Sequence, residues 1–122
     1  MDKLTAETIA LVLLRGGTAV DAAIAANAVL CVAYPHMAGL GGDGFWLIAD
    51  EKTNSIHGLN ASGHAAQLAT LDYYRSKAAD NEIPSRGPLS ILTVPGAVDG
   101  WRAAHERFGG LPWSELFEAA IT

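Results

Sequence analysis

The spacing of apolar and polar residues changes along the chain, and the changes predict its first elements. Apolar residues recur at helical spacing over residues 4–15, and Gly16-Gly17 can adopt the positive φ of a helix C-cap. A second helix is predicted over about residues 19–32, because Thr18 can cap its first turn and Asp21 faces the positive end of its dipole. This second segment is rich in alanine, so another element can approach its backbone closely. We therefore expect it to be buried.

A β-hairpin is predicted in the middle of the chain. Pro35 bars further helix, and the four glycines within residues 39–44 form a flexible loop. The short apolar run Phe45–Ala49 is typical of a largely buried strand, because it is bounded by turn residues. Residues 50–54 supply the turn, and residues 55–59 are expected to return as the partner strand.

The second half of the chain is predicted to contain three helices and one further strand. Thr70 precedes a third helix, and the polar run 79–88 is typical of a surface loop. Residues 89–94 predict the further strand, after which a fourth helix ends at Gly109-Gly110. The last predicted helix begins near Pro112 and continues to Thr122 without a stop signal.

Composition indicates one globular unit that is incomplete. The chain has 122 residues, of which 50% are hydrophobic and 17% charged, enough to bury a core in about one domain. No repeat or linker divides it. Because the last helix needs an apolar surface to cover, we expect residues 1–122 to be a single incomplete domain.

Net charge, the length of the apolar stretches and the N-terminal sequence indicate which partners and which location to expect. The formal net charge of −5 gives no basic field that would attract nucleic acid or an anionic membrane. The longest apolar stretch, residues 22–34, is too short to span a bilayer, so we expect a soluble protein. The N-terminus carries no secretory signal, which would place the protein in the cytoplasm if that N-terminus is native; otherwise the compartment stays open.

The residues alone offer no convincing catalytic or metal site. Gly39-x-Gly41-x-x-Gly44 has the letters of a dinucleotide fingerprint, but it follows a helix and leads into a strand, which is the wrong order. The four histidines lie on separate elements, so no metal site is expected. Ser62, His64 and Asp43 are the residue types of a nucleophilic triad, yet no nucleophile elbow surrounds the serine and chance co-occurrence is the simpler explanation. Cys31 is interpreted as a small buried apolar residue.

Three glycine-containing blocks, in the right order, resemble the γ-glutamyltranspeptidase family. Residues 16–26, Gly-Gly-Thr-Ala-Val-Asp-Ala-Ala-Ile-Ala-Ala, are similar to that family's Gly-Gly-Asn-Ala-Val-Asp-Ala-Ala-Val-Ala-Ala. Residues 35–45, Pro-His-Met-Ala-Gly-Leu-Gly-Gly-Asp-Gly-Phe, resemble its Pro-His-x-Ser-Gly-Ile-Gly-Gly-Gly-Gly-Phe. Residues 94–101 resemble its Val-Pro-Gly-x-Val-x-Gly block, and residues 111–116 the segment that follows. Together the blocks span nearly the whole chain.

The resemblance implies an α+β fold and an enzyme whose reactive residue lies elsewhere. Members of the family are N-terminal-nucleophile hydrolases with an αββα core, here represented by helices packed on a β-hairpin and a further strand. A precursor cuts itself into a large and a small subunit, and the new N-terminal threonine attacks a γ-glutamyl amide such as glutathione, with its own α-amine as the base. By resemblance, this chain belongs to the large subunit, contains no catalytic residue, and needs no metal or organic cofactor. Its partners would be the rest of the large subunit, the small subunit and a small-molecule amide.

One position departs from the family pattern. Where the family has Asn-Ala-Arg-Glu, with the arginine on the substrate's α-carboxylate, residues 60–63 read Asn-Ala-Ser-Gly, which puts Ser62 at the arginine position. Losing that bidentate contact costs on the order of 1.5–3 kcal/mol of recognition. Either another group binds the carboxylate, for which His64 with its partial charge near neutral pH is the nearest candidate, or the donor is not glutamyl. We hypothesise that Ser62 and His64 border the acyl pocket; a plain strand-to-helix turn is the alternative.

Two other functions therefore stay open. The first is a non-glutamyl acylase of the same family, similar to cephalosporin or glutaryl acylases. The second is a non-catalytic binding or structural module, which would fold by self-association.

Overall fold

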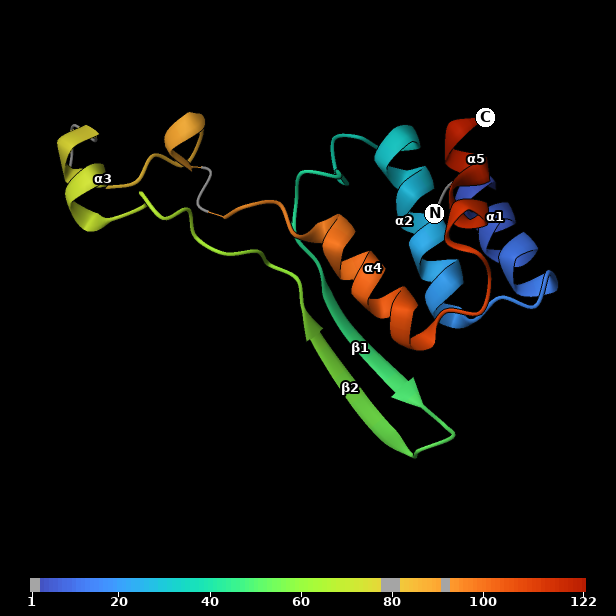
Figure 1. The fold of residues 1–122 in the computed structure, drawn as a ribbon. Coiled ribbons are helices and arrows are strands. Elements are labelled where there is room, and N and C mark those ends of the chain that lie inside the picture. Colours follow the sequence, from blue (N-terminus) through green and yellow to red (C-terminus); the bar gives the residue numbers. More distant parts are fainter. Residues whose placement is uncertain (1–2, 78–81, 91–92) are drawn as a thin grey trace.

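The computed structural model describes residues 3–77, 82–90 and 93–122. Three regions are visible in Figure 1: a group of packed helices, a hairpin beside α4, and a segment that extends away from both and carries α3. In chain order the elements are α1 (Lys3–Leu14), α2 (Ala19–Ala33), β1 (Phe45–Asp50), β2 (Ser55–Asn60), α3 (Leu71–Lys77), the 3₁₀ turn η1 (Pro88–Ser90), α4 (Ala97–Phe108), the 3₁₀ turn η2 (Trp113–Phe117) and α5 (Glu118–Ile121). We call α1, α2, α4, η2 and α5 the helical body, and the described residues between Ala65 and Thr93 the arm.

The start of α2 follows the predicted pattern. Gly16 has φ +88°, and Thr18 caps α2 in a capping box with Asp21: each side chain accepts the other residue's backbone N–H. A side chain at Gly17 would lie 2.8 Å from the Val12 carbonyl oxygen, so this turn requires a glycine. The predicted boundary between the first two helices is confirmed.

Helix α2 forms the centre of the core, as its alanine content predicts. Ile24 and Ala25 are fully buried, and Val29 nearly so. From the C-terminal half, Trp101 and Leu116 complete the same cluster, and the Trp101 ring stacks on Phe117 with centroids 6.3 Å apart. The core therefore joins the first third of the chain to its last quarter.

Asp21 also connects distant parts of the body. Its side chain is completely buried, and Oδ2 accepts the backbone N–H groups of Gly110, at 2.8 Å, and Leu111, at 3.2 Å. Nε2 of His105 lies 3.7 Å from Oδ1 and donates to the Leu111 carbonyl oxygen at 2.8 Å. One buried carboxylate thus holds the turn after α4 against the N-terminus of α2.

The hairpin has the predicted strands, but its predicted burial is wrong. β1 and β2 pair antiparallel from Phe45 opposite Asn60 to Asp50 opposite Ser55. Exposure alternates along β1, and Phe45 and Leu47 are largely exposed, whereas Trp46 and Ile48 pack against the core cluster. The physical reason is that the helices cover one face of the two-stranded sheet, so only alternate side chains are buried.

Two predictions in the second half are also corrected. The further strand over 89–94 is absent from the described residues: Pro88–Ser90 is a 3₁₀ turn, Thr93 makes only an isolated bridge to Ala65, and residues 91–92 lie outside the described part. The predicted single helix after Pro112 is instead η2 followed by α5. Leu116, in η2, is almost completely buried, and η2 packs against α2.

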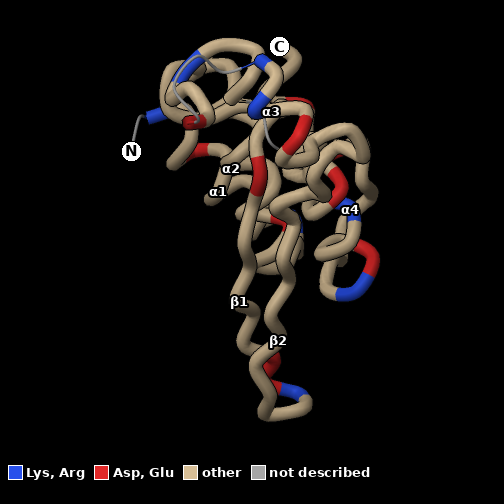
Figure 2. Tube along the Cα trace, turned by 90° about the vertical axis from the view of Figure 1, so that its left-hand side faces the viewer, with Lys and Arg blue, Asp and Glu red and all other residues tan. Residues whose placement is uncertain are grey.

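Acidic and basic residues are scattered along the trace rather than gathered in one block (Figure 2). Within the described residues, no helix combines the length and apolar character needed to cross a membrane.

Candidate functional site

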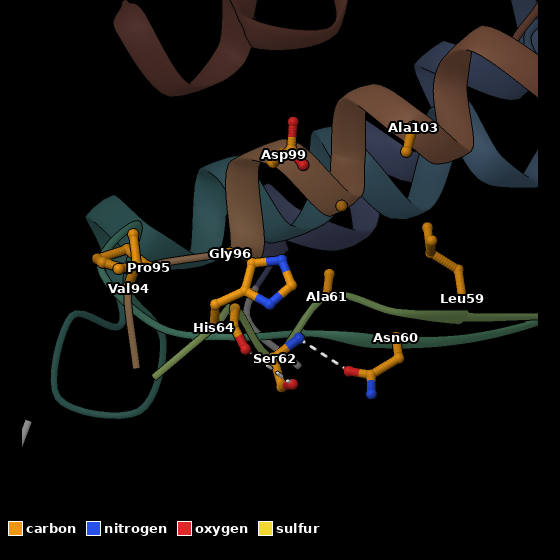
Figure 3. A pocket seen from close by; sticks show the side chains of 12 residues that line it. Leu59, Asn60, Ala61, Ser62, His64, Val94, Pro95, Gly96, Asp99 and Ala103 are labelled. Atoms are coloured by element: carbon orange, nitrogen blue, oxygen red, sulfur yellow. Dashed lines mark hydrogen bonds between the residues drawn. The ribbon is translucent and has the colours of Figure 1, made fainter. Parts of the chain in front are cut away.

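A cleft of about 460 Å³ lies where the chain leaves β2 and meets the N-terminus of α4 (Figure 3). It is formed by the residues at the end of β2 and after it, by the residues just before α4, and by part of α4 itself. The lining residues are Leu59, Asn60, Ala61, Ser62, Gly63, His64, Val94, Pro95, Gly96, Asp99, Gly100 and Ala103. Its volume is in the range of small-molecule sites.

The glycine loop before β1 positions this cleft by backbone hydrogen bonds. Gly44 and Ala61 exchange N–H to carbonyl bonds of 3.2 and 2.9 Å, which extend the hairpin pairing by one residue pair. The Gly42 carbonyl oxygen accepts the N–H groups of Gly96 and Ala97 at 3.0 and 3.1 Å. The loop therefore holds the start of α4 with an accepting carbonyl oxygen. A phosphate-binding loop instead presents donating N–H groups to its ligand.

Three glycines allow the two walls to touch. Gly63 has φ +78°, and a Cβ there would lie 1.8 Å from the Val94 carbonyl oxygen. A Cβ at Gly96 would lie 2.4 Å from the Ala61 carbonyl oxygen, and one at Gly100 2.4 Å from the Ala61 Cβ. Side chains at these positions would push the walls apart, so close backbone approach fixes the shape of the cleft.

Ser62 and His64, the predicted site residues, both line this cleft. Asn60 Oδ1 accepts the Ser62 N–H at 2.9 Å, while the Ser62 hydroxyl has only a long contact, 3.4 Å, to the Gly63 carbonyl oxygen. The backbone of His64 is held because its carbonyl oxygen accepts the Val94 N–H at 2.8 Å. Its imidazole is exposed and makes no hydrogen bond with the described residues. Contact of either side chain with a substrate stays a prediction.

Asp99 is a cleft residue that the sequence analysis did not single out. It lies in the first turn of α4, above His64 in the view of Figure 3. Arg102 donates to its Oδ1 from Nε at 3.2 Å and from Nη2 at 2.9 Å, and also pairs with Glu106. The hydrogen bonds to Asp99 and then Glu106 raise the pKa of the Arg102 guanidinium. The sequence did contain a signal for Asp99, because this residue falls within the family-like block 94–101. Only the tertiary structure, however, brings that block next to Ser62.

Asp43 and Cys31 lie apart from this cleft. Both line a smaller hollow of about 230 Å³, between α2, the glycine loop and Trp101. Burial raises the pKa of the Cys31 thiol. The sequence predicted a buried residue, and the structure shows Cys31 half-buried. The structure thus brings Ser62 and His64 to one cleft without Asp43.

A second Ser–His–Asp grouping occurs at the end of the hairpin, which sequence reasoning missed. Nε2 of His57 lies 3.0 Å from Ser55 Oγ and 4.0 Å from Asp50 Oδ2, while Nδ1 faces Arg107 Nη2 at 3.4 Å. In a catalytic triad the serine and the carboxylate contact opposite ring nitrogens. Here both contact the same nitrogen and the other nitrogen faces a guanidinium, so the grouping lacks the geometry of a triad. The grouping is a structural network. Among the described residues, no group of three or more His, Cys, Asp or Glu side chains is arranged to hold a metal ion.

The fold and the sequence blocks define the class of protein. The family model described as gamma-glutamyltranspeptidase matches residues 5–122, so the chain belongs to the γ-glutamyltranspeptidase family. Its structure resembles that of cephalosporin acylase from Bacillus halodurans with a TM-score of 0.88 and 36% identity, covering 97% of this chain and 22% of that one. The predicted α+β class of the N-terminal-nucleophile hydrolases is confirmed.

Relatives of this chain include proteins with enzyme names. The chain is 48% identical over 123 residues to an oxamate amidohydrolase proenzyme of Klebsiella pneumoniae subsp. pneumoniae, covering 97% of this chain and 22% of that protein. It is 45% identical over 106 residues to a glutathione hydrolase-like YwrD proenzyme of Bacillus subtilis, covering 87% and 20% respectively. The chain therefore spans about a fifth of the length of these relatives. The predicted relation to both γ-glutamyltranspeptidases and acylases is confirmed.

Proposed function

We propose that this chain is the N-terminal portion of an enzyme that hydrolyses or transfers γ-glutamyl groups of glutathione-type amides. The observation that carries the proposal is the cleft, which joins the segment after β2 to the Val94–Gly96 block of a chain that belongs to this family. The name of the glutathione hydrolase-like relative supports the substrate class. The nucleophilic threonine is proposed to lie outside these 122 residues, so that the chain alone is inactive.

In this proposal Ser62 and His64 form one rim of the acyl pocket, and the remainder of the protein closes it. One face of the hairpin exposes Phe45, Leu47 and Ile56 to solvent, and the arm is exposed as well. Both features support a chain that functions as part of a larger assembly. Since the oxamate amidohydrolase and glutathione hydrolase-like relatives are both named proenzymes, the proposed partners are the rest of the large subunit and the small subunit of the same precursor.

A second candidate is a non-glutamyl amidohydrolase or acylase of the same family. Ser62 favours it, because a serine cannot make the bidentate, charged contact of an arginine with a carboxylate. The names of two close matches, an oxamate amidohydrolase and a cephalosporin acylase, support this alternative.

The test uses the full-length gene product and a panel of amides with the same leaving group. The proposal predicts release of p-nitroaniline from γ-glutamyl p-nitroanilide; hydrolysis of oxamate or glutaryl amides in its place supports the second candidate. If no amide in the panel is cleaved and mass measurement shows that the native product ends at Thr122, the non-catalytic module is the better interpretation.

Ser62→Arg sharpens the same test. Restoring the bidentate contact is expected to lower KM for the γ-glutamyl donor about tenfold or more. Ser62→Gln, which is similarly long but uncharged, is the matched control and should leave KM nearly unchanged. Equal effects of the two substitutions would contradict the assignment of Ser62 to the acyl pocket.

A further inference from the structure

Every candidate donor carries a carboxylate. The γ-glutamyl and glutaryl groups have one at the end away from the reacting amide, and oxamate has one directly beside its amide. Both candidate functions therefore need a group that binds this carboxylate, because Ser62 stands at the position of the family's arginine. A carboxylate in a cleft requires a cation or charge-assisted hydrogen bonds, since leaving its charge unpaired costs free energy.

His64 is the lining residue that can supply a positive charge. The twelve lining residues all lie within the described ranges, and they include no lysine or arginine. Asp99 is the other ionisable lining residue and faces the cleft from α4. Its carboxylate accepts two hydrogen bonds from Arg102, which also pairs with Glu106, so this guanidinium is engaged within α4. Of the described walls, the imidazole of His64 is therefore the group available to a carboxylate.

The backbone of His64 is held on both sides. Its carbonyl oxygen accepts the Val94 N–H at 2.8 Å, and the next residue, Ala65, forms an isolated antiparallel bridge with Thr93. Before it, Gly63 lies so close to the Val94 carbonyl oxygen that a Cβ would be 1.8 Å away. The residue is thus fixed where the segment after β2 meets the segment before α4, and its side chain is the part that can adjust to a ligand.

The imidazole of His64 is free to bind. It is exposed and makes no hydrogen bond or ion pair with the described residues, and Figure 3 shows its ring between the start of α4 and Ser62. The small Ser62 side chain makes only a 3.4 Å contact with the Gly63 carbonyl oxygen. A protonated imidazole offers two N–H donors and a positive charge, which together suit a carboxylate.

We infer that His64 is a specificity-determining residue that binds the carboxylate of the acyl donor in its imidazolium form, in place of the family's arginine. The inference rests on the proposed amide chemistry and applies to both candidate functions. A guanidinium stays charged throughout the physiological range, whereas an imidazole loses its proton between about pH 5 and 8. Recognition of the carboxylate is therefore complete when the imidazole is protonated and is lost as rising pH removes the proton.

The experiment compares two donors on the full-length gene product: γ-glutamyl p-nitroanilide and 4-aminobutyryl p-nitroanilide, the same compound without its carboxylate. The ratio of their kcat/KM values isolates the carboxylate contact, because titration of the nucleophile affects both donors alike. We expect the ratio to favour the γ-glutamyl donor at about pH 5.5 and to fall about threefold to tenfold by about pH 8.5, mainly through KM. If the enzyme prefers glutaryl amides, glutaryl and butyryl p-nitroanilide form the equivalent pair.

Substitutions of His64 separate carboxylate binding from a structural role. His64→Gln should remove the pH dependence and lower the ratio at about pH 5.5 to the wild-type value at about pH 8.5. His64→Arg, which stays charged, should keep the ratio high over the whole range, a result that a purely structural role would not give. His36→Gln is the matched control, since His36 is also exposed but does not line the cleft, and should leave the pH profile unchanged.

A wild-type ratio that does not vary with pH, or the same ratio in His64→Gln as in wild type, would overturn the inference. If no donor is cleaved, the proposed function fails, and calorimetric titration of the same compounds still decides the inference. Tighter binding of the carboxylate compound at about pH 5.5 than at about pH 8.5, lost in His64→Gln, supports it. Equal dissociation constants for the paired compounds at about pH 5.5 refute it.

Discussion

Helices α2 and α3 begin with similar local signals but differ completely in burial. Thr18 caps α2 and Thr70 caps α3, where Thr70 Oγ1 accepts the Tyr73 N–H at 3.2 Å, and each helix has an aspartate in its first turn. Yet α2 lies at the centre of the core, whereas α3 has no buried residue. Capping therefore decides where a helix begins, while tertiary packing supplies most of its stability.

The largest expected effect on the free energy of unfolding is the difference between a substitution in the helical body and one in the arm. Trp101→Ala removes a buried ring from the core and is expected to lower the free energy of unfolding by about 3–5 kcal/mol. Leu71→Ala, at an exposed position of α3, is expected to change it by less than about 0.5 kcal/mol. Urea denaturation of the 122-residue chain followed by circular dichroism measures both. Similar losses would mean that the arm is packed as tightly as the body.

Substitution of Asp21 tests the difference between the helical body and the arm through polar contacts. Asp21→Ala leaves the N–H groups of Gly110 and Leu111 without their buried acceptor and removes the cap contact, so we expect a loss of about 2–4 kcal/mol. Asp72→Ala, in the first turn of α3, is the matched control and is expected to cost about 0.5 kcal/mol or less. The same denaturation experiment applies. A loss at Asp21 no larger than at Asp72 would show that its cross-chain hydrogen bonds contribute nothing.

Gly63 tests the junction between the hairpin and α4. Ala at this position combines a positive φ with a clash against the Val94 carbonyl oxygen, so we expect about 1–3 kcal/mol of destabilisation. Gly87 has φ +93° with nothing within 4 Å of a Cβ, so Gly87→Ala isolates the cost of the backbone conformation, about 1 kcal/mol. In the full-length enzyme only Gly63→Ala should also raise KM. Identical effects on stability and KM would argue against a fixed cleft.

The smallest effect concerns pH at the tip of the hairpin. The hydrogen bond from Thr53 Oγ1, assisted by the Lys52 N–H and by His57, lowers the pKa of Asp50 against the opposing effect of burial. Because the folded-state pKa is below the unfolded one, near 3.9, the stabilisation is present above the unfolded value and lost as pH falls through the folded value.

The measurement is the difference in free energy of unfolding between wild type and Asp50→Asn as a function of pH. It should shrink as the pH is lowered from 6 towards 2. Glu51→Gln, one residue further along the exposed turn, is the control and should show a smaller pH dependence. A constant difference for Asp50→Asn across this range would contradict the role of its charge.

Local signals were enough to locate most elements. The residues Gly16, Thr18 and Asp21 delimit the first two helices because a positive φ, a cap and a first-turn carboxylate act over a few residues. The apolar run Phe45–Ala49 and the turn residues 50–54 that follow it likewise indicated the hairpin. The family blocks identified a relation that the comparisons confirm, because glycines at sites of close contact leave a recognisable sequence pattern.

Only the tertiary structure decided the rest. It determined that Phe45 and Leu47 face outward, since a strand's periodicity cannot tell whether one or both faces of a sheet are covered. It replaced the strand expected at 89–94 with a 3₁₀ turn and an isolated bridge, because a strand needs a partner that the described residues do not supply. It also brought Asp99 to the cleft of Ser62 and His64, a contact between segments more than thirty residues apart. Such long-range contacts depend on how the whole chain packs, and no local pattern encodes them.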